Sequence, residues 1–130
     1  MLGTYENFKK TVSQKPYILH ITCHGDYYDP KETMTENRKG NLADSMLIFE
    51  KESGYGNEID KEKLFINDDS MKGIMLIFVA ACKSDRIGQM FQDRGGVRHV
   101  ICSDIEIDDS TTCEFTKAFY ARIFSGESIC

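Results

Sequence analysis

The 130-residue sequence contains no long apolar run, no cluster of basic residues and no signal-peptide pattern at its start. A membrane helix needs roughly 20 apolar residues, and no stretch approaches that length. Nucleic-acid binding needs clustered lysine and arginine, whereas this chain has a net charge of −5. We therefore expect no membrane and no nucleic-acid partner.

The cysteines also lack a pattern. They number five, an odd count, and do not show the regular spacing of a disulfide framework. Cys23, Cys82 and Cys102 lie in or at the end of apolar strand-like runs, where free cysteine behaves as a small hydrophobic residue. There is no Asn-X-Ser/Thr sequence either. These features favour a reducing, cytoplasmic location.

What is present is the composition of one soluble domain, with 41% apolar and 28% charged residues. Apolar runs predict strands at 17–23, 45–50, 74–81 and 97–103. Capping residues and apolar spacing predict helices at 59–72, 85–94 and from 111 to about 125, the last opened by a capping box. The strand at 17–23 should be covered on both faces, residues 26–41 should form a loop and 52–57 a turn. This alternation predicts an α/β fold, with a mostly parallel sheet flanked by helices.

Two of the predicted strands end in reactive side chains. One leads into His24-Gly25 and the other into Cys82, and ligands of open α/β sheets bind beyond such carboxyl ends. A thiol becomes a nucleophile when a nearby imidazole accepts its proton. The backbone N–H groups of Gly25 and Cys82 would then both point at a developing oxyanion. The pair predicts catalytic His24 and Cys82, with Gly25 and Cys82 forming an oxyanion hole.

Other interpretations of these residues stay open. A cysteine in an apolar strand is usually a core residue, and His20, deep in the first strand, is expected to be structural. A zinc site is conceivable, but no Cys-x-x-Cys pair supports it; its ligands would be Cys23, His24, His99 and Cys102. Arg86 has the wrong spacing for a phosphatase-type thiolate loop.

Asp108 and Asp109 also have two interpretations. They either cap the last helix or supply negative charge to a specificity pocket.

In their order along the chain, these segments resemble the CHAT domain, a family within the caspase-like peptidases that also include separase and the gingipains. The similarity covers residues 16–130 and its elements occur in the family's order. The matching segments are 18–25, the strand around Leu47, 76–82, 95–103, 107–109, Phe115, Phe119-Tyr120 and Ser125-Gly126.

The resemblance implies a caspase-like three-layer sandwich with Cys82 as nucleophile, His24 as proton shuttle and the Gly25 N–H in the oxyanion hole. In separase-like relatives an acidic residue after the next strand binds a basic P1 side chain, and Asp108 or Asp109 matches that segment. We therefore expect a cysteine endopeptidase that acts on protein or peptide substrates after Lys or Arg and uses no metal or other cofactor.

We expect residues 1–15 to be a lead-in or partial helix and residues 16–130 to be the CHAT-like domain of a larger protein. Only sixteen residues precede Tyr17 and the sequence stops at Cys130, so we expect some family elements to be missing at both ends. Three alternatives remain: a catalytically silent CHAT-like interaction module in a larger signalling protein, a plain α/β binding domain with an inert Cys82, and a hydrolase of non-peptide acyl groups.

Overall fold

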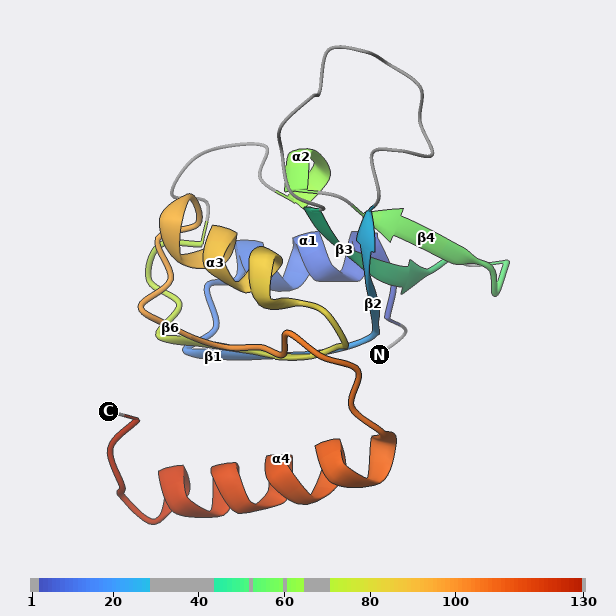
Figure 1. Ribbon diagram of the computed structural model, residues 1–130. Coiled ribbons are helices and arrows are strands. Elements are labelled where there is room, and N and C mark those ends of the chain that lie inside the picture. The colour runs from blue at the N-terminus through green and yellow to red at the C-terminus, as the bar shows by residue number, and fades with distance from the viewer. Residues whose placement is uncertain (1–2, 29–43, 52, 60, 65–70, 130) are drawn as a thin grey trace.

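A computed structural model describes residues 3–28, 44–51, 53–59, 61–64 and 71–129 (Figure 1). The described strands form two three-stranded sheets, one ordered β1-β5-β6 and the other β2-β3-β4. All pairs in the first sheet are parallel and all pairs in the second are antiparallel. The elements in chain order are α1 (Tyr5–Ser13), β1 (Ile18–Thr22), β2 (His24–Tyr28), β3 (Asp44–Glu50), β4 (Gly56–Ile59), α2 (Lys61–Leu64), β5 (Leu76–Ala80), α3 (Asp85–Asp93), β6 (His99–Ile101) and α4 (Asp109–Phe124).

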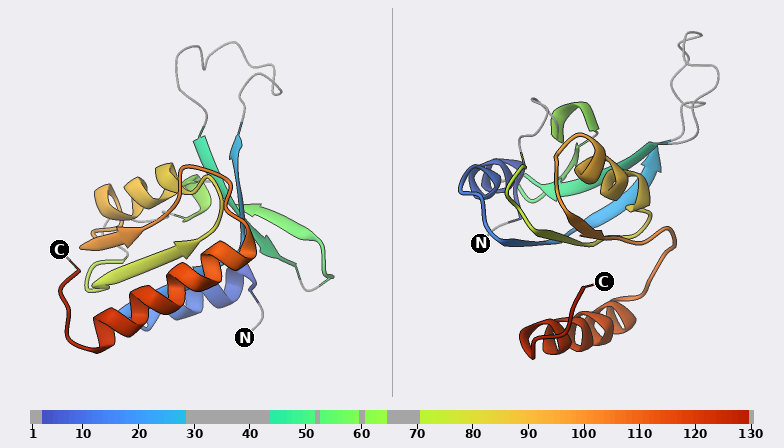
Figure 2. Two further views of the ribbon diagram at one scale, coloured as in Figure 1. Left: turned by 60° about the horizontal axis from the view of Figure 1, so that its bottom comes forward. Right: turned by 90° about the vertical axis from the view of Figure 1, so that its left-hand side faces the viewer.

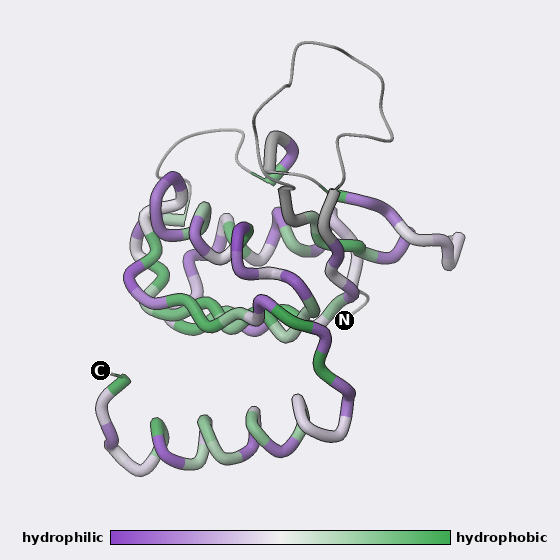
Figure 3. Tube along the Cα trace, viewed as in Figure 1, coloured by the Kyte–Doolittle hydropathy of each residue, from purple (hydrophilic) through white to green (hydrophobic). Residues whose placement is uncertain are grey.

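The parallel sheet is built around β5. This strand pairs with β1 on one edge and β6 on the other, and its residues from Leu76 to Val79 are all buried. A strand with neighbours on both edges and layers on both faces needs a continuous apolar sequence. The predicted central strand at 74–81 is therefore confirmed, as is the α/β layout of a parallel sheet flanked by helices. In Figure 3 the tube is mainly green, the apolar colour, in the region of this sheet.

One face of the parallel sheet carries the main core. Helices α1 and α3 and strand β3 cover it, as the views in Figures 1 and 2 agree. In α3, Ile87 and Phe91 are four residues apart, so both side chains lie on the same helix face and both are buried. Helix α1 begins at the cap Thr4, whose hydroxyl accepts the Asn7 N–H at 3.2 Å. Its Phe8 completes the core cluster with side chains from β1, β3 and β5.

The opposite face of the sheet is covered, among the described elements, by α4 alone (Figure 2). Phe78 of β5 is buried here, and its ring lies 5.5 Å from that of Phe119 and 5.7 Å from that of Tyr120. No residue of α4 itself is buried, and the Phe115 side chain is 54% exposed. The helix therefore rests on the sheet through ring contacts rather than through an enclosed core.

The main correction to the sequence-based expectation concerns His24. We expected the chain to enter a loop after this residue, with residues 26–41 forming that loop. Instead His24–Tyr28 form β2, which pairs with β3 and places Gly25 opposite Leu47. The polar sequence of β2 hid it, because its pairing partner lies about twenty residues later. Residues 29–43 lie outside the described part of the chain.

Three smaller expectations need adjustment. The turn expected at 52–57 is present between β3 and β4, but it ends earlier because β4 occupies Gly56–Ile59. The helix expected at 59–72 is present as α2 (Lys61–Leu64), which begins after β4, and residues 65–70 lie outside the described part of the chain. Leu64 is buried as expected, while Phe65 falls outside the described residues. Strand β1 is not covered on both faces, since every second side chain, beginning at His20, is exposed. Within the described residues, no helix is both long and apolar enough to cross a membrane.

Candidate functional site

The sheet register brings the two predicted site segments to one edge. Thr22 of β1 lies opposite Ala80 of β5. His24 and Cys82 each follow two residues later, so the parallel strands deliver them to the same end of the sheet, as predicted. Between β1 and β2 only Cys23 intervenes, and the chain passes from the parallel sheet into the antiparallel sheet at this point.

Gly25 lies directly against Cys82. A Cβ atom built on Gly25 would sit 2.1 Å from the Cys82 carbonyl oxygen and 3.2 Å from the Ala81 Cβ. No side chain fits at such a distance, so the close approach requires glycine. The close approach is to the Cys82 carbonyl oxygen, and the oxyanion role expected for the Gly25 N–H stays a prediction.

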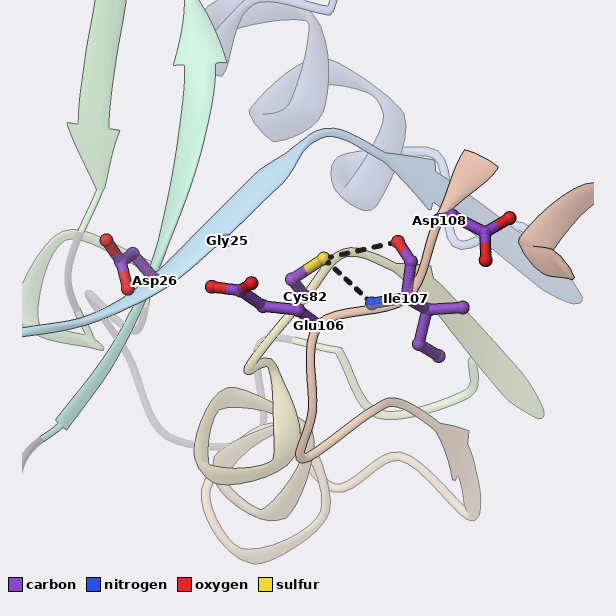
Figure 4. A pocket seen from close by; sticks show the side chains of 6 residues that line it. All are labelled: Gly25, Asp26, Cys82, Glu106, Ile107 and Asp108. Atoms are coloured by element: carbon purple, nitrogen blue, oxygen red, sulfur yellow. Dashed lines mark hydrogen bonds between the residues drawn. The ribbon is translucent and has the colours of Figure 1, made fainter. Parts of the chain in front are cut away.

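A pocket of about 410 Å³ opens beside this contact (Figure 4). Its walls come from the start of β2, the turn after β5 and the segment that leads into α4. Three of its lining residues carry carboxylates, so the pocket has an acidic character. The lining residues are Gly25, Asp26, Cys82, Glu106, Ile107 and Asp108.

The Cys82 sulfur is held by the backbone of Ile107. The Ile107 N–H donates to Sγ at 3.4 Å, and the thiol donates to the Ile107 carbonyl at 3.6 Å (Figure 4). The half-buried thiol therefore has both a donor and an acceptor from the backbone of one residue, and these contacts fix the position of the sulfur beside the pocket.

The turn that follows Cys82 is tightly fixed. Lys83 has a φ of 49°, in the left-handed region that side chains seldom adopt. Ser84, the N-cap of α3, is fully buried; its hydroxyl donates to the Ala81 carbonyl at 2.8 Å and accepts the Ser103 N–H at 3.2 Å. The Ser84 hydroxyl therefore connects the turn to the segment after β6, and it makes no capping hydrogen bond to α3.

The Lys83 side chain joins two of the pocket carboxylates. Its Nζ lies 3.1 Å from the Asp26 carboxylate and 3.0 Å from the Glu106 carboxylate. Hydrogen bonds to Glu106 and Asp26 raise the pKa of Lys83 above its usual value. Lys83 therefore remains a cation, and it links β2 to the segment leading into α4.

Asp108 is the N-cap of α4. Its two carboxylate oxygens accept the Thr111 N–H and the Thr111 hydroxyl, each at 2.8 Å. These hydrogen bonds lower the pKa of Asp108 below its usual value. The predicted capping box opening at Thr111 was thus misplaced: Asp108 caps the helix, which begins at Asp109. Asp108 also lines the pocket, whereas exposed Asp109 lies in the first turn of α4, outside the lining.

His24 is exposed and precedes Gly25 in β2, and it is not part of the pocket lining. Strand alternation puts its side chain on the same face of β2 as that of Asp26. Among the described residues, Ile107 supplies both hydrogen-bond partners of the Cys82 sulfur. The structure therefore brings Gly25, Cys82 and Asp108 together, with His24 beside them on the strand.

The remaining histidine and cysteine predictions fall elsewhere. His20 contacts the Tyr120 hydroxyl at 2.9 Å and the Thr22 hydroxyl at 3.0 Å, on the face of the sheet that α4 covers. Burial raises the pKa of the Cys23 thiol to about 12 and also raises that of Cys102. In the described ranges, no three His, Cys, Asp or Glu side chains gather in a group able to hold a metal ion.

Sequence reasoning missed Asp26, Lys83 and Glu106. All three are immediate sequence neighbours of residues that were identified, namely Gly25, Cys82 and Ile107 in the segment 107–109. Their position next to candidate site residues could have indicated them. Many charged residues on the surface have similar neighbours, however, so this signal is not specific.

Comparisons with known proteins give one match. The family model of the CHAT domain matches residues 2–129, nearly the whole chain, including α1. Neither a search of curated proteins nor a search of solved structures found a significant match.

Proposed function

We propose that this chain, which belongs to the CHAT domain family, is a cysteine endopeptidase that acts on protein or peptide substrates. The family is related to the caspase-like peptidases, which makes a peptidase role plausible. The observation that carries the proposal is the contact between Gly25 and Cys82 at the edge of an acidic pocket. At this contact the Cys82 thiol and the Gly25 backbone lie beside a pocket that can hold a ligand.

In the proposed reaction, His24 takes the Cys82 proton and Sγ attacks the substrate carbonyl carbon. The N–H groups of Gly25 and Cys82 would stabilise the oxyanion. The C–N bond then breaks, the amine leaves with the proton from His24, and a thioester remains on Cys82. Water, deprotonated by His24, hydrolyses the thioester to a carboxylic acid and restores the thiol. No cofactor enters these steps.

We propose a preference for Lys or Arg at P1, with Asp108 or Asp109 as the residues that bind it. Asp108 lines the pocket and its hydrogen bonds with Thr111 keep it ionised, which supports its role over that of Asp109. The proposal includes a reducing, cytoplasmic setting within a larger protein. The free state of Cys23, Cys82, Cys102 and Cys113 is consistent with that setting.

Hydrolysis of fluorogenic peptides tests the proposal. The native chain should cleave reporters with Arg or Lys at P1, and Cys82→Ala should abolish cleavage. His24→Ala should lower kcat/KM about 10²- to 10⁴-fold, the usual contribution of a general acid–base group. Cys113→Ala is the matched control, because Cys113 is an exposed thiol on α4. Equal hydrolysis by native protein and Cys82→Ala would overturn the peptidase role, and a preference for Asp at P1 would overturn the basic specificity.

A second candidate is a catalytically silent interaction module of a larger signalling protein. It is favoured by the double contact of the Cys82 sulfur with Ile107 and by the exposed position of His24 outside the pocket lining. Iodoacetamide labelling at neutral pH, located by mass spectrometry, separates the two. A peptidase should label faster at Cys82 than at exposed Cys113, and slower labelling of Cys82 together with absent hydrolysis would favour the module.

A further inference from the structure

We infer that Lys83 is the resident counter-cation of the Cys82 pocket and sets its charge selectivity, so that a cationic ligand group enters by replacing the Lys83 ammonium at Asp26 and Glu106. The inference rests on the proposed use of this pocket as the substrate site. The effect of the Lys83 charge on the pocket can nevertheless be measured without any hydrolysis.

The position of Lys83 carries the first step. The residue directly follows Cys82, and its ammonium lies between a carboxylate from β2 and one from the segment before α4. Both carboxylates line the pocket. The Lys83 ammonium therefore occupies the position that a cationic side chain of a substrate would take between Asp26 and Glu106.

The charge balance gives the second step. Among the described residues that line the pocket, three carry carboxylates, and two of these share the ammonium of Lys83. Asp108 has both oxygens engaged by Thr111 at the start of α4. Asp26 and Glu106 are thus the acids whose cation can be exchanged, which adds them to Asp108 as specificity residues.

Exposure gives the third step, because it decides whether Lys83 can be displaced. The Lys83 side chain is 27% exposed, whereas those of Asp26 and Glu106 are 52% and 76% exposed. Ion pairs with such exposed carboxylates are weak and compete with water and other ions. A ligand cation can therefore take over the carboxylates without breaking a buried ion pair.

Charged thiol reagents report the potential at Cys82 directly. The experiment compares modification rates by cationic 2-aminoethyl, anionic 2-sulfonatoethyl and neutral methyl methanethiosulfonate, with the site located by mass spectrometry. The native chain should prefer the cation. Lys83→Gln should increase the ratio of cationic to anionic rate about fivefold or more, since one unit charge at about 4 Å in water changes a rate by that factor. Lys83→Arg should restore the native ratio.

Lys117→Gln is the matched control. It removes the same charge from an exposed position more than two helical turns along α4 from Asp108, so the ratio should stay native. Raising the salt concentration to 1 M should shrink all charge preferences, because the Debye length falls to about 3 Å.

Three outcomes would overturn the inference: an unchanged ratio in Lys83→Gln, a Lys83→Arg variant that behaves like Lys83→Gln, or a Cys82 that reacts with none of the reagents. The last would mean that the pocket is closed to small molecules. If peptides are hydrolysed, Lys83→Gln should lower KM for Arg reporters with little change in kcat. If no peptide is hydrolysed but the ratio shifts as expected, the peptidase proposal fails and the role of Lys83 stands.

Discussion

The two faces of the parallel sheet are packed differently. Above the sheet, α1, α3 and β3 enclose a core in which Leu47, Ile77 and Phe91 are fully buried. Below it, α4 rests on Phe78 without burying any of its own residues. The same strands therefore support a well-buried layer on one side and a helix with no buried residue on the other.

This difference bears on the site because the segment before α4 forms one wall of the pocket. Ile107 holds the Cys82 sulfur, and Asp108 caps α4. The other walls come from β2 and from the turn locked by Ser84, both joined to the well-packed side. The pocket thus lies between a well-buried part of the fold and a helix held to the sheet by aromatic contacts.

Breaking the packed face should have the largest effect. Phe91 of α3 is fully buried, so Phe91→Ala should lower the free energy of unfolding by about 3–5 kcal/mol, from lost burial and the cavity left behind. Urea denaturation followed by circular dichroism measures this loss. Gln92→Ala, at the exposed neighbouring position, is the control and should change the free energy by no more than about 0.5 kcal/mol. A loss below about 1 kcal/mol in Phe91→Ala would contradict the core described above.

Weakening the α4 face should have a smaller and more local effect. Phe119→Ala removes ring contacts with Phe78 and Tyr120, and we expect a loss of about 1–2 kcal/mol. Amide hydrogen exchange should speed up in α4 and stay unchanged in α3, because α4 can open without the core. Phe124→Ala is the control, because this 74% exposed ring stacks on Tyr120 of the same helix rather than on the sheet, and α4 exchange should stay near native. Equal acceleration in α3 would show that the two faces unfold together.

Acidification should produce the smallest effect, and again on the α4 face. His20 is exposed overall, but its ring is partly covered by Tyr120 and Phe78, and this partial burial lowers the pKa of His20. The unfolded chain therefore binds more protons than the folded chain as pH falls through the usual histidine value near 6.5. Stability from this residue is therefore full above that pH and declines below it. The urea midpoint should fall slightly more between pH 7.5 and 5.5 for the native chain than for His20→Gln. An identical fall in both proteins would contradict the prediction.

The sequence was sufficient where a segment carries its own pattern. Eight consecutive apolar residues identify β5, and the spacing of Ile87 and Phe91 identifies α3. The sequence was insufficient where a residue distant in the chain determines the local structure. Strand β2 has a polar sequence that predicts a loop, because its pairing partner β3 lies later in the chain. The cap of α4 is different, because Asp108 was already one of the two interpretations open from the sequence, although the capping box was placed at Thr111.

The same limit applies to the site. The closeness of Gly25 to Cys82 could be predicted because the carboxyl ends of parallel strands in one sheet lie at the same edge. The contact of Lys83 with Asp26 joins residues 57 positions apart, and the contact of the Cys82 sulfur with Ile107 joins residues 25 apart. Such contacts depend on the direction in which each turn points its side chains, and no local sequence pattern predicts that direction.

The left-handed backbone of Lys83 has a consequence for how this position tolerates change. Glycine or asparagine would suit that conformation better than lysine, yet either would remove the charge from the pocket. Under the proposed role of Lys83, the backbone conformation and the charge of the pocket therefore favour different residues at this position. A screen for thermal tolerance alone should enrich glycine or asparagine at position 83, and thereby erode the site while improving the protein that carries it.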